Sequence, residues 1–174
     1  MRYFLALIMC MSFMFTHGQE SEVKFKDQVY SVDAIIENLY DVISGEKGEP
    51  RDWDLFRQLF YSDAKLIPSG PNQEGLVNAR FMTPDDYVEG AAKWLLDNGF
   101  FEREIHRVTQ SFGSLTHVFS TYEAFRSDKD EKPFMRGINS IQLMNDGERW
   151  WIINIYWTQE REGNAIPKKF LPDN

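Results

Sequence analysis

The last third of the chain, from Ser114 to Glu160, most constrains the fold, because apolar and polar residues alternate through three consecutive segments. Such alternation is typical of β-strands that bury one face. Between the second and third segments lies Asn145-Asp146-Gly147-Glu148, whose Asp-Gly pair favours a tight hairpin turn. The pattern predicts an antiparallel meander over residues 114–125, 134–144 and 149–159.

Helix signals occupy the part of the chain before the meander. Ser31 can cap a first helix that stops at Gly45, and Asp52 can cap a second. Thr83-Pro84-Asp85-Asp86 begins a third helix, with a capping Thr, a Pro in the first turn and two acids near the positive end of the dipole. The sequence predicts helices at residues 32–45, 53–63 and 84–97 and two more strands at residues 64–68 and 101–110. Helices followed by antiparallel strands indicate an α+β domain with the helices on one face of the sheet.

The N-terminus reads as a secretory signal peptide. Arg2 precedes an apolar run over residues 3–15, and Thr16 and Gly18 are small residues at a typical cleavage position. The alternative is a membrane anchor, but the run is shorter than the roughly 20 residues that span a bilayer. We expect residues 1–18 to be removed, and the mature chain, without a membrane span, to be secreted or periplasmic.

Charge and cysteine content exclude several kinds of partner and site. The chain has 27 acidic and 19 basic residues, a formal net charge of −8, and its basic residues are dispersed. Nucleic-acid binding needs clustered Lys and Arg, so no nucleic-acid partner is expected. The one cysteine, Cys10, lies in the predicted signal peptide, so the mature domain must be stabilised by its core rather than by disulfides.

Several short sequence segments together resemble those of one superfamily. These are Trp53 with the helix that follows it, the strand at residues 64–68, the helix start Thr83-Pro84-Asp85-Asp86-Tyr87, and residues 146–157. From about Val32 to Thr158 the chain resembles the nuclear transport factor 2-like superfamily, in its SnoaL-like and ketosteroid-isomerase-like branches. The resemblance implies a cone-shaped, curved antiparallel sheet wrapped around three helices, with a pocket at the open end. The domain is then residues 31–160, between an N-terminal segment at residues 19–30 and a C-terminal tail at residues 161–174.

The hairpin pattern predicts which residues face this pocket. If Asp146-Gly147 is a two-residue loop, Asn139 lies opposite Asn154 and Gly137 opposite Tyr156, on the same face as two apolar pairs near the turn. Polar groups in a setting of Trp and Ile suggest ligand contacts, and a register error of one residue would instead turn the Trp157 face inward. The predicted ligand-binding residues are Asn139, Asn154, Tyr156, Trp53 and His106.

The opposite face of the last predicted strand carries Trp151, Ile153, Ile155 and Trp157. A monomer rarely exposes so large an apolar patch. We therefore expect a homodimer that buries this face.

Four residues are candidates for proton transfer. His106 is either a pocket acid or base or a hydrogen-bonded structural residue. Glu123 is either catalytic or paired with Arg136 on the neighbouring strand. Asp54 is either a base or a compensating charge at a helix N-terminus. Tyr156 could stabilise an oxyanion.

Other chemistries lack their motifs. The sequence contains no Gly-x-Ser-x-Gly elbow, no closely spaced His or Cys ligands and no Gly-rich phosphate loop, so neither a metal nor a cofactor is expected. Two functions remain. The first is an exported pocket protein that binds a small, largely apolar ligand. The second is a cofactor-independent isomerase, cyclase or dehydratase that uses a pocket acid or base.

Overall fold

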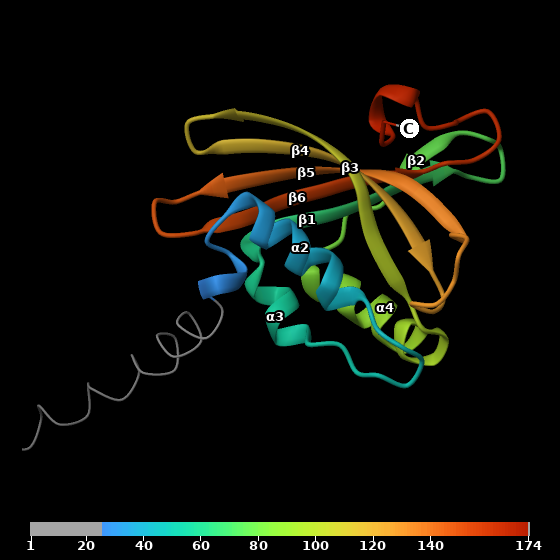
Figure 1. Ribbon diagram of the computed structural model, residues 1–174, viewed down its shortest axis with the longest axis horizontal. Coiled ribbons are helices and arrows are strands. Elements are labelled where there is room, and N and C mark those ends of the chain that lie inside the picture. The colour runs from blue at the N-terminus through green and yellow to red at the C-terminus, as the bar shows by residue number, and fades with distance from the viewer. Residues whose placement is uncertain (1–25, 174) are drawn as a thin grey trace, which may run out of the picture.

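The computed structural model of the protein describes residues 26–173 (Figure 1). The predicted signal peptide lies outside these residues. The described chain contains short 3-10 helices η1 (Lys26–Gln28) and η2 (Lys168–Phe170) and α-helices α2 (Val32–Ile43), α3 (Trp53–Gln58) and α4 (Pro84–Asn98). Its strands are β1 (Phe60–Pro71), β2 (Val77–Ala79), β3 (Phe101–Phe112), β4 (Leu115–Phe125), β5 (Met135–Asn145) and β6 (Trp150–Gln159). No helix within residues 26–173 has the length and apolar character needed to cross a bilayer.

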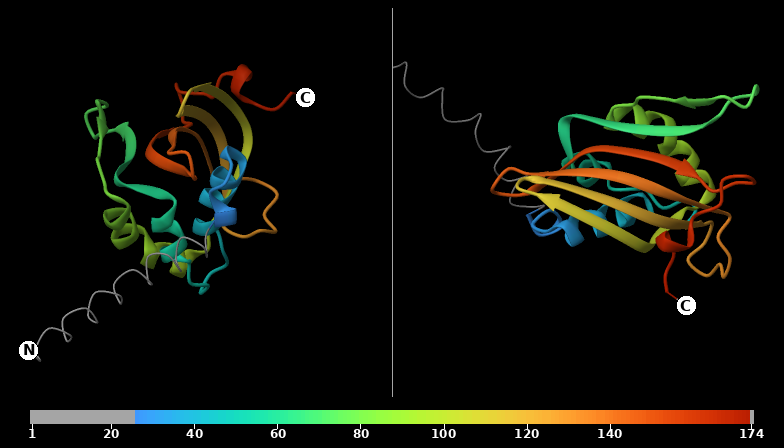
Figure 2. Two further views of the ribbon diagram at one scale, coloured as in Figure 1. Left: turned by 90° about the vertical axis from the view of Figure 1, so that its left-hand side faces the viewer. Right: turned by 90° about the horizontal axis from the view of Figure 1, so that it is seen from above.

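The strands form one mixed sheet in the order β2-β1-β6-β5-β4-β3. The sheet is strongly curved and unclosed, and the three α-helices lie on its concave side (Figures 1 and 2). The predicted α+β class and the cone-like curved sheet are confirmed. One detail differs from the expected antiparallel pattern, because β1 runs parallel to β6. The chain between β1 and its parallel neighbour β6 contains β2, α4, β3, β4 and β5.

The predicted helix starts are confirmed by their caps. The Ser31 hydroxyl accepts a hydrogen bond from the Ala34 amide at 3.0 Å, and the Asp52 carboxylate accepts one from the Leu55 amide at 2.9 Å. Thr83 forms a reciprocal capping box with Asp86 at the start of α4. Each side chain satisfies a backbone donor that a helix N-terminus otherwise leaves unpaired.

Helix α3 ends five residues earlier than the sequence pattern predicts. The chain leaves the helix at Gln58, and the carbonyl of Leu59 accepts a hydrogen bond from the Ile152 amide at 2.8 Å. Phe60 then pairs with Ile152 in the sheet. Sheet pairing with β6 therefore replaces the last helical turn. Leu59 is the C-cap residue, Phe60 begins β1, and both remain buried.

The core fills the space between α2, α3 and the concave face of the sheet. Its members are aliphatic and aromatic side chains from every layer, and burying them supplies most of the driving force for folding. The largest of those with at most 1% exposure are Ile35, Ile36, Phe56, Leu59, Ile141, Leu143 and Ile152.

The C-terminal end of α2 is held by a buried arginine. The guanidinium of Arg51 donates hydrogen bonds to the carbonyls of Ile43 at 2.9 Å and Gly45 at 2.7 Å, and the residue is 8% exposed. The Ile43 carbonyl would otherwise lack a partner at the helix end, whereas the Gly45 carbonyl also accepts a hydrogen bond from the Phe100 amide at 3.0 Å. A Cβ at Gly45 would lie 2.5 Å from the guanidinium, so a larger residue there would displace the Arg51 side chain. Burial lowers the pKa of Arg51.

Two β-bulges change which residues face the helices. The first lies in β3 between Glu104 and His106, and the second lies in β6 between Ile152 and Asn154. A bulge adds one residue to one strand, so the strand alternation reverses after it. Both reversals bear directly on the candidate site.

The C-terminal tail lies on the convex side of the sheet, away from the helices (Figure 1). The Thr121 hydroxyl donates a hydrogen bond to the Phe170 carbonyl at 2.6 Å, and the rings of Phe119 and Phe170 lie 4.8 Å apart. The Ile166 amide donates to the Glu160 carboxylate at 3.0 Å. The tail is thus an ordered segment packed on the sheet.

Candidate functional site

A cavity of about 200 Å³ lies between the concave face of the sheet and the three α-helices. Its walls combine aromatic and aliphatic side chains with only two other polar residues, Glu102 and Asn139. The aromatic members are Tyr40, Phe56, Tyr87, Phe100, Tyr122 and Trp157, and the aliphatic members are Leu39, Ile43, Leu66, Met135 and Ile155. A cavity with mostly apolar walls and a few polar groups is the usual form of a small-molecule site.

Glu102 supplies the one ionisable carboxyl group in the cavity wall. The residue as a whole is half-buried, but protein atoms surround its carboxyl group. Within residues 26–173, no Lys, Arg or His side chain lies within ion-pair distance of it. Burial raises the pKa of Glu102 to about 8, and the hydrogen bond from Asn139 opposes this shift. The carboxyl group is therefore mostly protonated at neutral pH.

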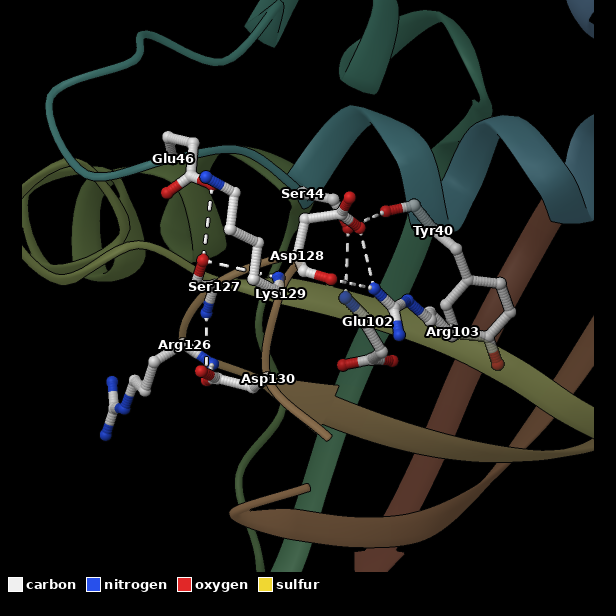
Figure 3. Close-up of polar contacts among 10 residues, drawn as sticks. All are labelled: Tyr40, Ser44, Glu46, Glu102, Arg103, Arg126, Ser127, Asp128, Lys129 and Asp130. Carbon is white, nitrogen blue, oxygen red and sulfur yellow. Dashed lines mark hydrogen bonds and ion pairs between the residues drawn. The ribbon is translucent and has the colours of Figure 1, made fainter. Parts of the chain in front are cut away.

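The backbone of Glu102 is tied to the end of α2 (Figure 3). Its amide donates a hydrogen bond to the Ser44 hydroxyl at 3.0 Å, and this hydroxyl donates to the Tyr40 carbonyl at 2.7 Å. Ser44 is the C-cap residue of α2. The link fixes the start of β3 against the helix and so places Glu102 beside Tyr40.

Asn139 on β5 connects Glu102 to Tyr40 on α2. Its Nδ2 donates hydrogen bonds to the Glu102 carboxyl oxygen at 3.2 Å and to the Tyr40 hydroxyl at 3.1 Å. The Tyr40 hydroxyl also contacts the Ser120 hydroxyl at 2.7 Å, and Ser120 donates to Glu104. A continuous chain of polar groups therefore runs from the cavity to the rim of the sheet.

Two further tyrosines bring phenol groups to the same cavity. Tyr87 comes from α4 and Tyr122 from β4, and burial followed by the nearby Glu102 raises the pKa of each. Within residues 26–173, neither hydroxyl makes a hydrogen bond. Both are potential donors to a bound molecule. Gly137 makes room for Tyr122, because a Cβ there would lie 2.6 Å from the phenol oxygen.

A groove adjoins the cavity and shares Tyr40 and Glu102 with it. Its other members are charged side chains of α2 and β3: Asp33, Glu37, Asp41, Arg103, Glu104 and Arg107. Burial and then the nearby Glu37 raise the pKa of Asp41.

Both arginines of the groove are engaged by carboxylates. Arg107 binds Glu104 and also contacts Asp33 at 2.7 Å. Arg103 contacts Asp128 at 2.6 Å (Figure 3). The loop that carries Asp128 is folded by Asp130, which accepts hydrogen bonds from the amides of Arg126 and Ser127.

The structure places Asn139 in the cavity wall but puts Asn154 and Tyr156 on the convex face of the sheet. The turn between β5 and β6 is longer than the expected two-residue loop, because Asn145 pairs with Trp150 and residues 146–149 connect the strands. Beyond the bulge in β6, Asn139 pairs with Trp157, so the expected pairing of Asn139 with Asn154 is wrong. Asn154 donates a hydrogen bond to Gln142 at 2.8 Å, and Tyr156 is 43% exposed. The extra residue in β6 turns Ile155 and Trp157 inward instead.

The expected dimer face is wrong for the same reason. Ile155 is 5% exposed and both Ile155 and Trp157 line the cavity. Trp151 lies before the bulge and packs edge-on against Tyr61 at 5.8 Å. The four residues predicted to form one patch therefore lie on different faces.

The remaining predicted site residues lie outside the cavity wall. His106 follows the bulge in β3 and pairs with Thr121, on the convex face. The ring of Trp53 packs edge-on against Phe56 at 5.6 Å without lining the cavity. The side chain of Asp54 is 88% exposed and lies 3.6 Å from Arg57.

Glu123 pairs across the strands with Arg136 at 3.7 Å, so the predicted Glu123–Arg136 pair is present.

Sequence reasoning missed the ionisable groups that do line the cavity: Tyr40, Tyr87, Glu102 and Tyr122. One signal for Glu102 was present. Glu102 and Glu104 are two residues apart in a predicted strand, so they share a face, and an acid on the buried face of a strand is unusual. Among the described residues, no group of three or more His, Cys, Asp or Glu side chains is arranged to hold a metal ion.

Comparison with known proteins rests on structure, since no family model and no curated protein matches the sequence. An NTF-2 like protein of unknown function from Silicibacter pomeroyi aligns with a TM-score of 0.51 and 13% identity over 74% of this chain and 92% of that chain. A putative ketosteroid isomerase from Parabacteroides distasonis aligns with a TM-score of 0.51 and 16% identity over 78% and 97%. LinA aligns with a TM-score of 0.53 and 6% identity over 83% and 88%. The chain therefore has the nuclear transport factor 2-like fold, as its sequence phrases predicted.

Proposed function

We propose that the protein binds a small, largely apolar molecule in the cavity between the sheet and the helices. The observation that carries this proposal is the cavity of about 200 Å³ whose wall is aromatic and aliphatic apart from Glu102 and Asn139. An apolar cavity of roughly 150 Å³ in another protein is large enough to bind benzene. A molecule with one or two rings is therefore of suitable size.

The polar groups of the cavity supply orientation. Glu102 and the phenols of Tyr87 and Tyr122 can exchange hydrogen bonds with a polar group of the ligand, while Asn139 is already committed to Glu102 and Tyr40. A few polar groups in an apolar setting give specificity because each is costly to leave unpaired.

Isothermal titration with naphthylmethanol tests this proposal. We expect saturable binding with a Kd below about 1 mM, given the size of the probe. Met135 lines the cavity, so Met135→Trp should fill it and abolish binding while the protein stays folded. Asn154→Ala, on the convex face, is the matched control and should bind as the wild type does. Equal binding by the Met135→Trp variant would place the probe elsewhere and overturn the proposal.

A second candidate function is proton transfer by a cofactor-independent isomerase, cyclase or dehydratase. The observation that favours it is Glu102, whose pKa of about 8 suits an acid or base working near neutral pH. In this version Glu102 removes a proton next to a carbonyl, and the phenols of Tyr87 and Tyr122 donate hydrogen bonds to the developing oxyanion. Glu102, Tyr87 and Tyr122 therefore take the acid, base and oxyanion-stabilising roles. The sequence had suggested these roles for His106, Glu123, Asp54 or Tyr156.

Exchange of the α-protons of tetralone in heavy water, followed by NMR, tests the second candidate. We expect exchange catalysed by the wild type and lost in Glu102→Gln, with Glu123→Gln as the control outside the cavity. Binding of tetralone without catalysed exchange would leave the protein as a binding module.

Export and self-association are further proposals. The signal-like residues 1–18 support export of the mature chain. Exposed apolar side chains on the convex face support a homodimer, with Val108 37%, Phe112 87%, Leu115 53% and Tyr156 43% exposed. Val108 and Tyr156 belong to one row across four strands, through Phe119 and Ser140.

A further inference from the structure

We propose that the ligand preferred by this cavity is an organic cation, with an amine or ammonium group attached to an apolar body of one or two rings. This inference rests on the proposed binding function and names the chemical class of the ligand. It is carried by three features of the site: the unpaired carboxyl group, the aromatic wall around it, and the acidic groove that adjoins it.

The first feature is the carboxyl group of Glu102, which has no cationic partner within residues 26–173. A buried carboxyl group without a counter-charge takes up a proton, because ionisation in such a setting is costly. A ligand with a positive charge removes that cost by supplying the missing partner. The ligand amine and Glu102 would then form a buried ion pair in which Asn139 donates a hydrogen bond to the carboxylate.

The second feature is the aromatic wall. Tyr40, Tyr87 and Tyr122 come from α2, α4 and β4, and burial, followed by the charge of Glu102, raises the pKa of each phenol. All three rings are therefore close to this carboxyl group. Trp157 lines the same cavity from β6. Aromatic rings attract cations through their quadrupoles, and groups of such rings are a known means of recognising ammonium ligands.

The third feature is the groove that shares Tyr40 and Glu102 with the cavity. Its carboxylates are Asp33, Glu37, Asp41 and Glu104, and its cations are Arg103 and Arg107. Arg107 is bound by Glu104 and Asp33, and Arg103 by Asp128. Glu37 and Asp41 have no such partner among the described residues. The groove therefore has an excess of negative charge, which attracts cations and repels anions.

The net charge of the whole chain also favours cationic over anionic ligands. The formal net charge is −8, so cations are concentrated and anions depleted near the surface. This effect is weaker than the local one at physiological ionic strength, because charges beyond about 8 Å are screened. The local excess around Glu102 is therefore the discriminating feature.

Three probes with the same ring and different charge test the proposal: naphthylmethylamine, naphthylmethanol and naphthoate. Near neutral pH they are cationic, neutral and anionic. We expect the amine to bind at least about tenfold more tightly than the alcohol, because it gains an ion pair with Glu102 and attraction to the aromatic rings. The carboxylate should bind most weakly. The amine should also release up to one proton on binding, because Glu102 ionises. Titration in two buffers with different ionisation enthalpies measures this release.

Two variants separate the local carboxyl group from the general charge. Glu102→Gln should lower the affinity for the amine to that for the alcohol and abolish the proton release. Glu123→Gln removes one negative charge on the opposite face of the sheet, so this variant should keep the preference for the amine and the proton release. Circular dichroism of each variant checks that it is folded.

Each outcome decides a different question. If the alcohol binds as tightly as the amine in the wild type, the proposal for a cation is wrong and the binding function stands. If the amine preference persists in Glu102→Gln, the carboxyl group is not its origin and the proposal is wrong. If none of the three probes binds the wild type, the proposed binding function itself fails.

Discussion

Asn139 on β5 donates a hydrogen bond from Nδ2 to the carboxyl oxygen of Glu102 on β3 at 3.2 Å, although β4 lies between the two strands. The strong curvature of the sheet brings the two residues together across its concave face. The bond places the amide where it can stabilise the ionised form of Glu102. It also makes Asn139 a structural partner rather than a free ligand contact.

Replacing Asn139 by Leu should destabilise the fold by about 1–3 kcal/mol, because the Tyr40 hydroxyl and the Glu102 carboxyl both lose a donor in a buried setting. Asn154→Leu is the matched control on the exposed convex face and should stay within about 0.5 kcal/mol of the wild type. Urea unfolding measures both. Equal losses in the two variants would contradict the assignment of Asn139 to the buried face.

Stability should fall as pH rises from about 5 to about 8. The pKa of Glu102 is raised from 4.5 to about 8 in the folded protein, so across this interval the folded state keeps a proton that the unfolded state has lost. The contribution of Glu102 is therefore complete below pH 4.5 and is lost by about pH 8. Glu102→Gln should flatten this dependence, with a difference on the order of 5 kcal/mol across the window. Urea unfolding at several pH values measures it, and parallel curves for the two proteins would show that Glu102 is not the titrating group.

Gly137→Ala should destabilise the protein by about 1–3 kcal/mol through overpacking. The added Cβ would lie 2.6 Å from both the Thr158 carbonyl oxygen and the Tyr122 phenol oxygen, and the backbone carbonyl cannot move aside easily. Gly70→Ala is the matched strand control, because a Cβ at Gly70 would meet no atom within 4 Å. Thermal unfolding compares the two, and a Gly137→Ala variant as stable as Gly70→Ala would mean that β5 is not packed in this way.

Ile155 and Tyr156 are neighbours that should respond oppositely to a charge. Ile155→Asp puts a carboxylate into the cavity wall and should cost about 3–5 kcal/mol or prevent folding. Tyr156→Asp alters the convex face, so it should leave the fold intact and weaken self-association if the homodimer forms there. Light scattering with circular dichroism distinguishes these effects. A folded Ile155→Asp variant would argue against the bulge in β6.

Export predicts a mature protein that begins at or near Gln19, since Thr16 and Gly18 provide the small residues that signal peptidase prefers. Intact-mass measurement on protein recovered from the periplasm or the medium checks the N-terminus. A chain that still carries residue 1 would contradict the proposal.

The elements that the sequence predicted well have strong local signals. Ser31, Asp52 and Thr83 each cap a helix as expected, because capping depends on the side chain and the next three residues. The fold follows from the order of these elements and of the strands after them. Element order survives errors of one or two residues at each boundary.

The site could not be predicted with the same success because it depends on single-residue irregularities. The bulge in β6 near Ile153 reversed the faces of Asn154 and Tyr156, and the bulge in β3 near Ile105 separated His106 from Glu104. Neither bulge carries a Gly or another clear local signal. Asn139 lies on β5, which has no such irregularity before it, and its inward position was predicted correctly.

The C-terminal tail, held on the convex face through Thr121 and Phe119, covers part of the sheet as an intramolecular binding partner would. A short tether gives such a segment an effective concentration in the millimolar range, well above that of most free partners. Any protein that binds this half of the convex face must first displace the tail. Partner access to the row that contains Val108 and Tyr156 is therefore decided by residues 161–173, because this row includes Phe119, which the tail covers. Phe112 and Leu115, at the turn between β3 and β4, are exposed and lie outside the contacts of the tail.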